Sequence, residues 1–170
     1  MLNREARIVP KCQKTAILFK HLPEETMPRP FHLAFPTSDL ARTRDFYVEA
    51  LGCALGRQDA SWIDLDFFGH QLVFHECGGF VLPKSSNPVD QAQVPIPHFG
   101  VILEPMAFDR LAEHLEHRVA FLIEPTVRFA GTAGEQKTLF FLDPDGYALE
   151  FKSFADDRFI FEPFSDEGQP

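Results

Sequence analysis

Two histidines stand at matching places in the chain, and a carboxylate stands near its end. His32 lies in PFHLAF and His98 in PHFGVIL, each close behind a proline at the start of an apolar run. Glu150 lies inside the apolar run YALEF. A carboxylate in a buried strand must be paired, bound to a metal or protonated, because an isolated buried charge is too costly. A histidine in a strand is more often a structural residue than a ligand, so the matching positions carry the prediction.

Two imidazoles and one carboxylate on one sheet form the facial triad of non-haem iron sites, which leaves coordination positions open for substrate. Zinc, nickel or manganese can use the same ligands. Alternation along a strand places His32 beside Ala34, His98 beside Gly100 and Glu150 beside Ala148. Small neighbours leave room for a ligand. We therefore predict a divalent metal, with Fe(II) favoured, held by His32, His98 and Glu150.

The elements that position these residues recur in two halves. The first half has a strand at PFHLAF, a helix at 40–51 that begins at Ser38 or Asp39 and ends at Gly52, and strands at WIDLDF and QLVFHE. The second half has a strand at PHFGVIL, a helix at 108–117, strands at VAFLIEP and KTLFFL, a DPDG turn and a last strand at YALEFKSF. The proline-rich connector 83–97 is expected to be an ordered loop.

This repeat predicts an α+β fold in which two modules of one helix and several strands share a curved mixed sheet. A plain ferredoxin-like fold is the alternative. We expect an N-terminal extension over residues 1–28 that is poorly ordered, and a single domain over 29–155. Its modules span about 29–82 and 96–154, and residues 156–170 form a tail that covers either a pocket or a dimer surface.

Composition excludes several classes of protein. The net charge is −9, and the basic residues gather before Pro23, so the main body is acidic and a poor partner for nucleic acid. No apolar run is long enough to span a membrane, and no secretory signal is recognisable. Cys12, Cys53 and Cys77 have no metal-type spacing, which suits a reducing compartment. We expect a cytoplasmic protein that binds a small molecule, with no nucleic acid or membrane partner.

The segments FHLAFPTSDLARTRDFYVEALGC, PHFGVIL and FLDPDGYALEFK resemble the vicinal-oxygen-chelate superfamily of glyoxalase I, bleomycin-resistance proteins and type I extradiol dioxygenases. DPDGYALE is the most specific of these segments. The resemblance covers about residues 31–154 and is greatest to small extradiol dioxygenase-like or glyoxalase-family proteins. It implies βαβββ modules that pair into a metal cup, with His32, His98 and Glu150 at three of its ligand positions.

The chain departs from glyoxalase I at the fourth ligand, a glutamate in the last strand of the first module. Counting from Gly69 as from Gly146 gives Val73 at that position, and a shift of two residues gives His75. The missing carboxylate weakens an isomerase reaction, which needs a carboxylate to move a proton. His75 stays open as a fourth ligand or a base.

The resemblance to extradiol dioxygenases is incomplete as well. Phe140 stands where their signature has a tyrosine, and no histidine precedes it at the expected distance. His70 and His75 are the candidate proton-transfer residues, and alternation along the strand lets at most one of them face the cup. Trp62, Phe140 and Gln136 are predicted to contact the substrate, although Trp62 is more economically explained as part of the core or of the cup wall, and Gln136 is at least as well explained as a solvated turn residue.

These observations predict a metal-dependent enzyme for a small substrate with two adjacent oxygens, extradiol dioxygenase-like in its chemistry. A glyoxalase-like lyase or isomerase using Zn or Ni is one alternative, and a non-catalytic small-molecule-binding protein is the other. The resemblance also implies a homodimer, in which the modules pair within one chain or across two.

Overall fold

A computed structural model describes residues 29–83, 85–89 and 92–162. The N-terminal extension predicted over 1–28 and the last part of the predicted tail lie outside the described residues. The chain divides into two units, 1–31 and 32–170, and all elements below belong to the second unit.

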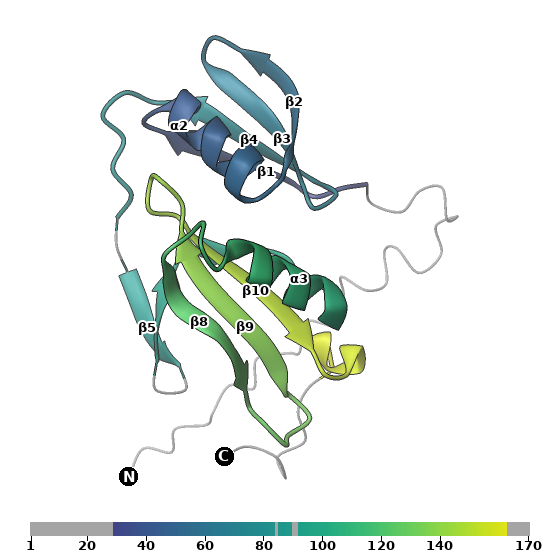
Figure 1. Ribbon diagram of the computed structural model, residues 1–170. Coiled ribbons are helices and arrows are strands. Elements are labelled where there is room, and N and C mark those ends of the chain that lie inside the picture. Colours follow the sequence, from purple (N-terminus) through teal and green to yellow (C-terminus); the bar gives the residue numbers. More distant parts are fainter. Residues whose placement is uncertain (1–28, 84, 90–91, 163–170) are drawn as a thin grey trace, which may run out of the picture. The chain divides into compact units, whose positions relative to one another are not determined.

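The first module has the order strand, helix, strand, strand, strand (Figure 1). Its elements are β1 (His32–Thr37), α2 (Leu40–Asp45), the π-helix η2 (Phe46–Ala50), β2 (Ala54–Asp59), β3 (Trp62–Phe67) and β4 (His70–Glu76). The strand order in its sheet is β1-β4-β3-β2, with β1 parallel to β4 and the other pairs antiparallel.

The second module repeats this plan. Its elements are β7 (His98–Phe99), α3 (Pro105–Leu115), β8 (Phe121–Arg128), β9 (Gln136–Leu142) and β10 (Ala148–Phe154), followed by the 3-10 helix η3 (Asp157–Ile160). The strand order is β7-β10-β9-β8, with β7 parallel to β10. The predicted α+β fold of two βαβββ modules is confirmed. The prediction that the modules share one sheet is wrong, because each module forms its own four-stranded, mixed sheet and the two pack through a common core.

The connector is more regular than expected. Instead of a loop it holds a two-stranded hairpin, β5 (Ser85–Val89) with β6 (Ala92–Ile96). Its prolines favoured a loop because proline cannot donate a backbone hydrogen bond. A strand with a single partner tolerates proline, and Pro88 and Pro95 lie in such strands.

The first helix begins as its sequence predicts. The Asp39 side chain accepts a hydrogen bond from the Arg42 backbone N–H, which satisfies a donor of the first turn. The helix then widens into η2, and Gly52 ends it with φ of 73°. Tyr47 of η2 is fully buried and anchors this segment to the core.

Both modules contribute to one hydrophobic core through the helix-covered faces of their sheets. Along β4, Leu72 and Phe74 belong to this core, and along β10, Leu149 and Phe151 belong to it. Aromatic rings join the modules there, with centroids of Phe67 and Phe151 6.1 Å apart. The alternate residues of each strand lie on the opposite side, which we call the open face. The two open faces therefore lie outside the shared core.

The DPDG turn fastens the second module to the first. Asp145 accepts hydrogen bonds from Thr37 Oγ1 and from the backbone N–H and hydroxyl of Ser38, and it pairs with Arg42 at 3.1 Å. Burial would raise the pKa of Asp145, but these hydrogen bonds outweigh it and lower the pKa. Because all these donors come from the first module, the turn fixes the two modules together.

Asp143, in the same turn, accepts from the hydroxyl of Tyr47 and from the backbone N–H groups of Asp145 and Tyr147. Burial outweighs these bonds and raises the pKa of Asp143 to about 6. This buried carboxylate therefore titrates at a higher pH than an exposed one.

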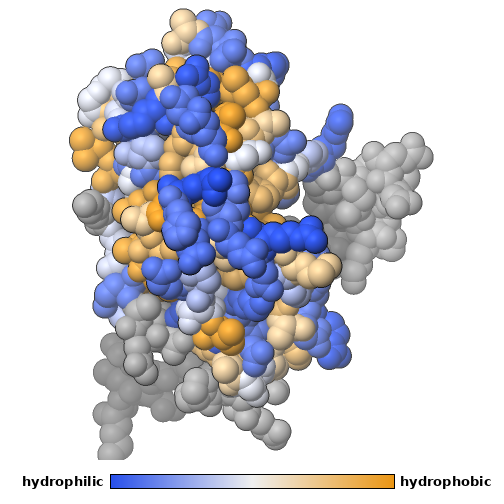
Figure 2. All heavy atoms as spheres, viewed as in Figure 1, coloured by the Kyte–Doolittle hydropathy of each residue, from blue (hydrophilic) through white to orange (hydrophobic). Residues whose placement is uncertain are grey.

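Hydrophilic and hydrophobic residues both reach the surface. On the face seen in Figure 2, hydrophilic and hydrophobic residues are interspersed. Every helix in the described ranges is too short or too polar to cross a bilayer.

Candidate metal centre

His98 has a fixed tautomer. Its Nδ1–H donates to the carbonyl oxygen of Pro95 at 2.7 Å, because a carbonyl can only accept. The neutral ring therefore keeps a lone pair on Nε2. The ring also packs edge-on against Phe140, with centroids 5.4 Å apart, which restricts its rotation.

Glu150 is a buried carboxylate with 8% of its surface exposed, as the apolar run around it predicts. Its Oε1 accepts a hydrogen bond from Thr138 Oγ1 at 2.9 Å and lies 3.3 Å from Lys152 Nζ. Its Oε2 lies 3.2 Å from His98 Nε2. One oxygen is thus held by the protein and the other faces the imidazole.

The contact between His98 Nε2 and Glu150 Oε2 requires a proton or a metal ion between the two atoms. Both atoms carry lone pairs when His98 is neutral and Glu150 is ionised, so they repel unless a proton or a metal ion lies between them. A histidine oriented through Nδ1 and a carboxylate with its second oxygen hydrogen-bonded are typical of metal ligands. The residues of this half-site therefore fit a divalent metal.

His32 is held in the same way in the first module. Its Nδ1 lies 2.8 Å from Oε1 of Gln71, its partner across the β1–β4 pair. Gln71 in turn donates from Nε2 to Asp64 at 3.1 Å, which sets its amide so that Oε1 accepts from His32. Arg57 completes the chain, with Nε 2.9 Å from Asp64 Oδ2. His32 Nε2 is left with its lone pair.

The three predicted ligands do not meet within one chain. Only His98 and Glu150 are joined, and no group of three His, Cys, Asp or Glu residues in the described ranges is close enough to hold a metal. The shared core explains the separation: His32 lies on the open face of the first sheet and Glu150 on that of the second.

The strand register places the other candidates of the first module. Val73 lies two residues beyond Gln71 on β4, and His75 lies two residues further on the same open face, paired with Trp62. His70 has the opposite parity, so of the two candidate proton-transfer residues only His75 lies on the open face. Trp62 lies on that face too, with the Arg57 guanidinium 5.7 Å from its ring centroid.

In the second module, Phe140 and Gln136 share the open face of Glu150. Phe140 is fully buried and its ring packs against that of His98, so it supports the His98 ring in this structure. Gln136 Oε1 is buried and finds no hydrogen-bond donor among the described residues. It is thus a buried acceptor without a donor among the residues that the structure describes.

The residues that orient the three candidate side chains were not among those predicted from the sequence. These are Gln71, Asp64 and Arg57 in the first module, and Pro95, Thr138 and Lys152 in the second. Alternation along β10 could have found Lys152, which lies two residues from Glu150 on the same face, and Thr138 required the register between β9 and β10. Gln71 required the register between β1 and β4.

The second sheet also requires a glycine beside the site. A Cβ at Gly100 would lie 1.6 Å from the backbone oxygen of Glu150. Only glycine allows the chain after β7 to approach β10 so closely, which keeps His98 beside Glu150.

Comparison with known proteins agrees with this architecture. Residues 29–151 match the Glyoxalase/Bleomycin resistance protein/Dioxygenase superfamily. A glyoxalase/bleomycin resistance protein/dioxygenase from Alicyclobacillus acidocaldarius is 38% identical, covers 78% of this chain and 96% of its own, and gives a TM-score of 0.66.

More distant structures share the fold. A virulence protein from Salmonella typhimurium is 26% identical over 76% of this chain and 98% of its own, with a TM-score of 0.52. The fosfomycin resistance protein FosX from Listeria monocytogenes is 15% identical over 77% of this chain and 97% of its own, with a TM-score of 0.56, and shows the fold alone. By the match over 29–151 and the 38% identical relative, the chain belongs to the glyoxalase/bleomycin resistance protein/dioxygenase superfamily.

Proposed function

We propose that this protein is a metal-dependent enzyme of its superfamily, extradiol dioxygenase-like, for a small substrate with two adjacent oxygens. One observation carries the proposal. Both histidines at the repeat-equivalent positions donate Nδ1–H to a carbonyl-type oxygen, so both present Nε2 on an open face. Metal-ligating histidines are usually oriented in this manner.

We propose further that two copies of the chain complete each site. The open faces lie outside the core that the modules share, so His32 reaches a His98–Glu150 pair only from a second copy. A homodimer would then hold two equivalent sites, each with His32 from one chain and the pair from the other. A closed dimer of this kind is the commonest assembly of identical chains.

His32, His98 and Glu150 would hold the metal, with Fe(II) favoured and Zn, Ni or Mn as alternatives. The bound metal would supply Lewis acidity and open positions for both substrate oxygens. Thr138 and Lys152 hold Oε1 of Glu150 and so fix the direction of Oε2. Gln136 offers a buried acceptor to a substrate hydroxyl, and Trp62 offers an aromatic face.

The register favours oxygenation over isomerisation. No carboxylate stands at Val73, and the neighbouring Asp64 already accepts from Arg57 and Gln71. An isomerase base on this face would have to be His75, which is exposed and two residues from Val73. A glyoxalase-like lyase or isomerase using Zn or Ni is therefore the second candidate.

The metal content of anaerobically purified protein tests the proposal. We expect about one metal ion per chain, lost in His98→Ala and in Glu150→Ala and kept in His117→Ala, an exposed histidine outside both open faces. Iron supports the oxygenase, whereas zinc or nickel supports the lyase. Failure to bind any of these metals after reconstitution contradicts both and leaves a binding protein.

Mixing variants tests the shared site. Unfolded and refolded together, His32→Ala and Glu150→Ala chains form mixed dimers with one intact site and one doubly altered site. Metal content should then recover to about half of the parental value per mixed dimer. No recovery means that each chain builds its own site. With a metal-loaded dimer, oxygen uptake on a catechol panel separates oxygenase from lyase.

A further inference from the structure

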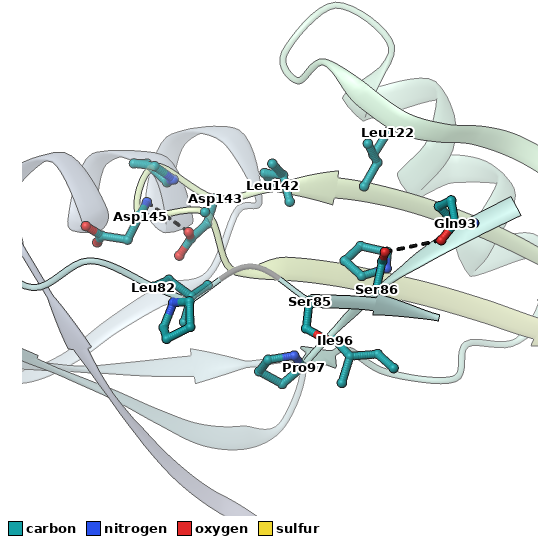
Figure 3. Close-up of a pocket in the computed structure, with 14 residues that line it drawn as sticks. Leu82, Ser85, Ser86, Gln93, Ile96, Pro97, Leu122, Leu142, Asp143 and Asp145 are labelled. Carbon is teal, nitrogen blue, oxygen red and sulfur yellow. Dashed lines mark hydrogen bonds between the residues drawn. The ribbon is translucent and has the colours of Figure 1, made fainter. Parts of the chain in front are cut away.

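A cavity of about 770 Å³ lies beside the segment Pro95–Pro97, which leads directly into His98. Its walls are the β5–β6 hairpin, the chain leading to His98, and the ends of β8 and β9 (Figure 3). Leu122 and Leu142 face Ile96 and Pro97 across it. Its volume is in the range of pockets that hold ligands of drug size, about 300–1,000 Å³.

Strand register places this cavity on the open face of the second module. Leu142 pairs with Ala148, and Ala148 pairs with His98, so Leu142 lies level with the metal-ligand histidine two strands away. Pro95 makes the connection direct, since it lines the cavity and its carbonyl oxygen accepts the Nδ1–H of His98. Pro95 of the cavity wall thus also orients the His98 ring.

The lining is mainly apolar and partly exposed. Ile96, Leu122 and Leu142 each leave more than two fifths of their surface uncovered, at 44%, 50% and 43%. Large apolar side chains gathered around one cavity indicate a binding site, unlike single exposed ones. Prolines contribute much of the remaining wall, at positions 83, 95, 97 and 144.

The polar lining excludes an anionic group. Asp143 and Asp145 both line the cavity, and their oxygens already accept hydrogen bonds from the turn and from the first module. These carboxylates add negative charge to the cavity, and the described part of its lining contains no basic side chain that could pair with an anionic group of a substrate. At the far edge, Ser86 bonds to Gln93 at 3.2 Å and supplies neutral polar groups.

We infer that the β5–β6 hairpin is a substrate-recognition element and that its cavity takes a neutral alkyl or aryl arm of the substrate. This inference rests on the proposed function for the position of the two metal-bound oxygens. The substrate is then larger than a bare catechol or small dicarbonyl, and its uncharged arm extends from the metal toward Leu122 and Ile96.

Two probes test the cavity. The first, N-phenyl-1-naphthylamine, is a neutral apolar fluorophore that needs no metal. It should bind metal-free protein with increased emission, and Leu122→Trp and Ile96→Trp, which fill the cavity, should abolish that increase. Val127→Trp is the matched control, because Val127 lies on β8 with 51% exposure and does not line the cavity.

The second probe is a pair of catechols titrated calorimetrically into zinc-loaded protein, where no turnover occurs. 4-Butylcatechol should bind at least about tenfold tighter than catechol, since each buried methylene adds affinity. Leu122→Trp should remove this advantage and leave catechol binding unchanged.

The outcomes separate the two proposals. Fluorophore binding that depends on the cavity, without zinc or catechol binding, supports the apolar pocket and contradicts the metal enzyme. Equal affinity for both catechols, with fluorophore emission unchanged in Leu122→Trp, overturns the pocket and leaves the metal site intact. Dissociation of the dimer in Leu122→Trp, measured by light scattering, also overturns it, because the apolar wall would then be an interface between copies.

Discussion

Val73 occupies in the first sheet the position that Glu150 occupies in the second. His32 pairs with Gln71 and His98 pairs with Ala148, and Val73 and Glu150 each follow by two residues on the same strand. The repeat has thus kept the geometry of a ligand position in both modules and kept a carboxylate in only one. The proposed metal would therefore have three protein ligands, and its other coordination positions would be open.

Val73→Glu should restore a fourth ligand. Without metal, the buried carboxylate next to Asp64 should lower the melting temperature by several degrees, because a charge is buried without a partner. Zinc should raise the melting temperature of this variant more than that of the parent. Val73→Met, which has no oxygen, controls for size, and an equal zinc response in all three proteins would show that β4 does not approach the metal.

Gln71→Leu should weaken metal binding without removing a ligand. It deprives His32 of the acceptor for Nδ1–H, so the tautomer and ring orientation are no longer fixed. Loss of such a partner typically costs about 10- to 100-fold in metal affinity. Chelator competition measures this, and Gln71→Glu, which still accepts, should recover most of the affinity. Unchanged affinity in Gln71→Leu would argue that His32 is not a ligand.

Gly100→Ala should separate the two ligands of the second module. The added Cβ would collide with the backbone oxygen of Glu150, so the strand must move. We expect loss of measurable metal binding and a lower midpoint of urea unfolding. Gly78→Ala, whose Cβ would meet nothing within 4 Å, should leave both unchanged. Retained metal binding in Gly100→Ala would mean that the site tolerates a displaced β7.

Asp145→Ala should destabilise the fold by about 2–4 kcal/mol, because it removes the carboxylate that accepts hydrogen bonds from the buried Thr37 hydroxyl and from the half-buried Ser38 and that joins the two modules. Urea unfolding measures the change. Arg42→Ala removes only the half-exposed partner of the same carboxylate, so it should cost about 1 kcal/mol or less. Similar costs for the two variants would show that the modules do not depend on this turn.

Asp143 should make the protein less stable as the pH rises. Its folded pKa of about 6 exceeds the ordinary value of 3.8, so the native state keeps its proton longer than the unfolded chain. The stabilisation that Asp143 contributes to the folded state is complete below about pH 4. It is lost as the pH rises through about 6, by up to roughly 3 kcal/mol in the free energy of unfolding.

Asp143→Asn should remove this fall, since the amide oxygen still accepts from the turn and nothing titrates. Melting temperatures between pH 4 and pH 7 measure it. Asp45→Asn, at an exposed carboxylate, should follow the parent. A parallel decline in Asp143→Asn would assign the pH dependence to other groups.

The sequence predicted the fold because the fold follows from local pattern. The apolar run around Glu150 also predicted that its carboxylate needs partners, and Thr138, His98 and Lys152 contact it in the structure. Gln71 could not be predicted in the same way, because it meets His32 through a parallel pairing between strands far apart in the chain. That register is set by packing and by the turns, which a one-dimensional pattern does not contain.

The connector shows the same limit from another side. Its prolines and polar residues predict a loop, whereas in the structure Ser85–Val89 and Ala92–Ile96 pair with each other as antiparallel strands. The separation of His32 from Glu150 was equally hidden, since it depends on which faces of the two sheets pack together.

In the proposed dimer, the hydrophobic core lies within each chain, and the two proposed half-sites lie outside that core. Folding would then involve one chain alone, whereas assembly of the proposed centre would involve two chains and would depend on protein concentration. Diluting the protein below its dimerisation constant should release metal and abolish turnover from chains that remain folded. A higher concentration of the protein in the cell would thereby raise the activity of each chain as well as the total activity.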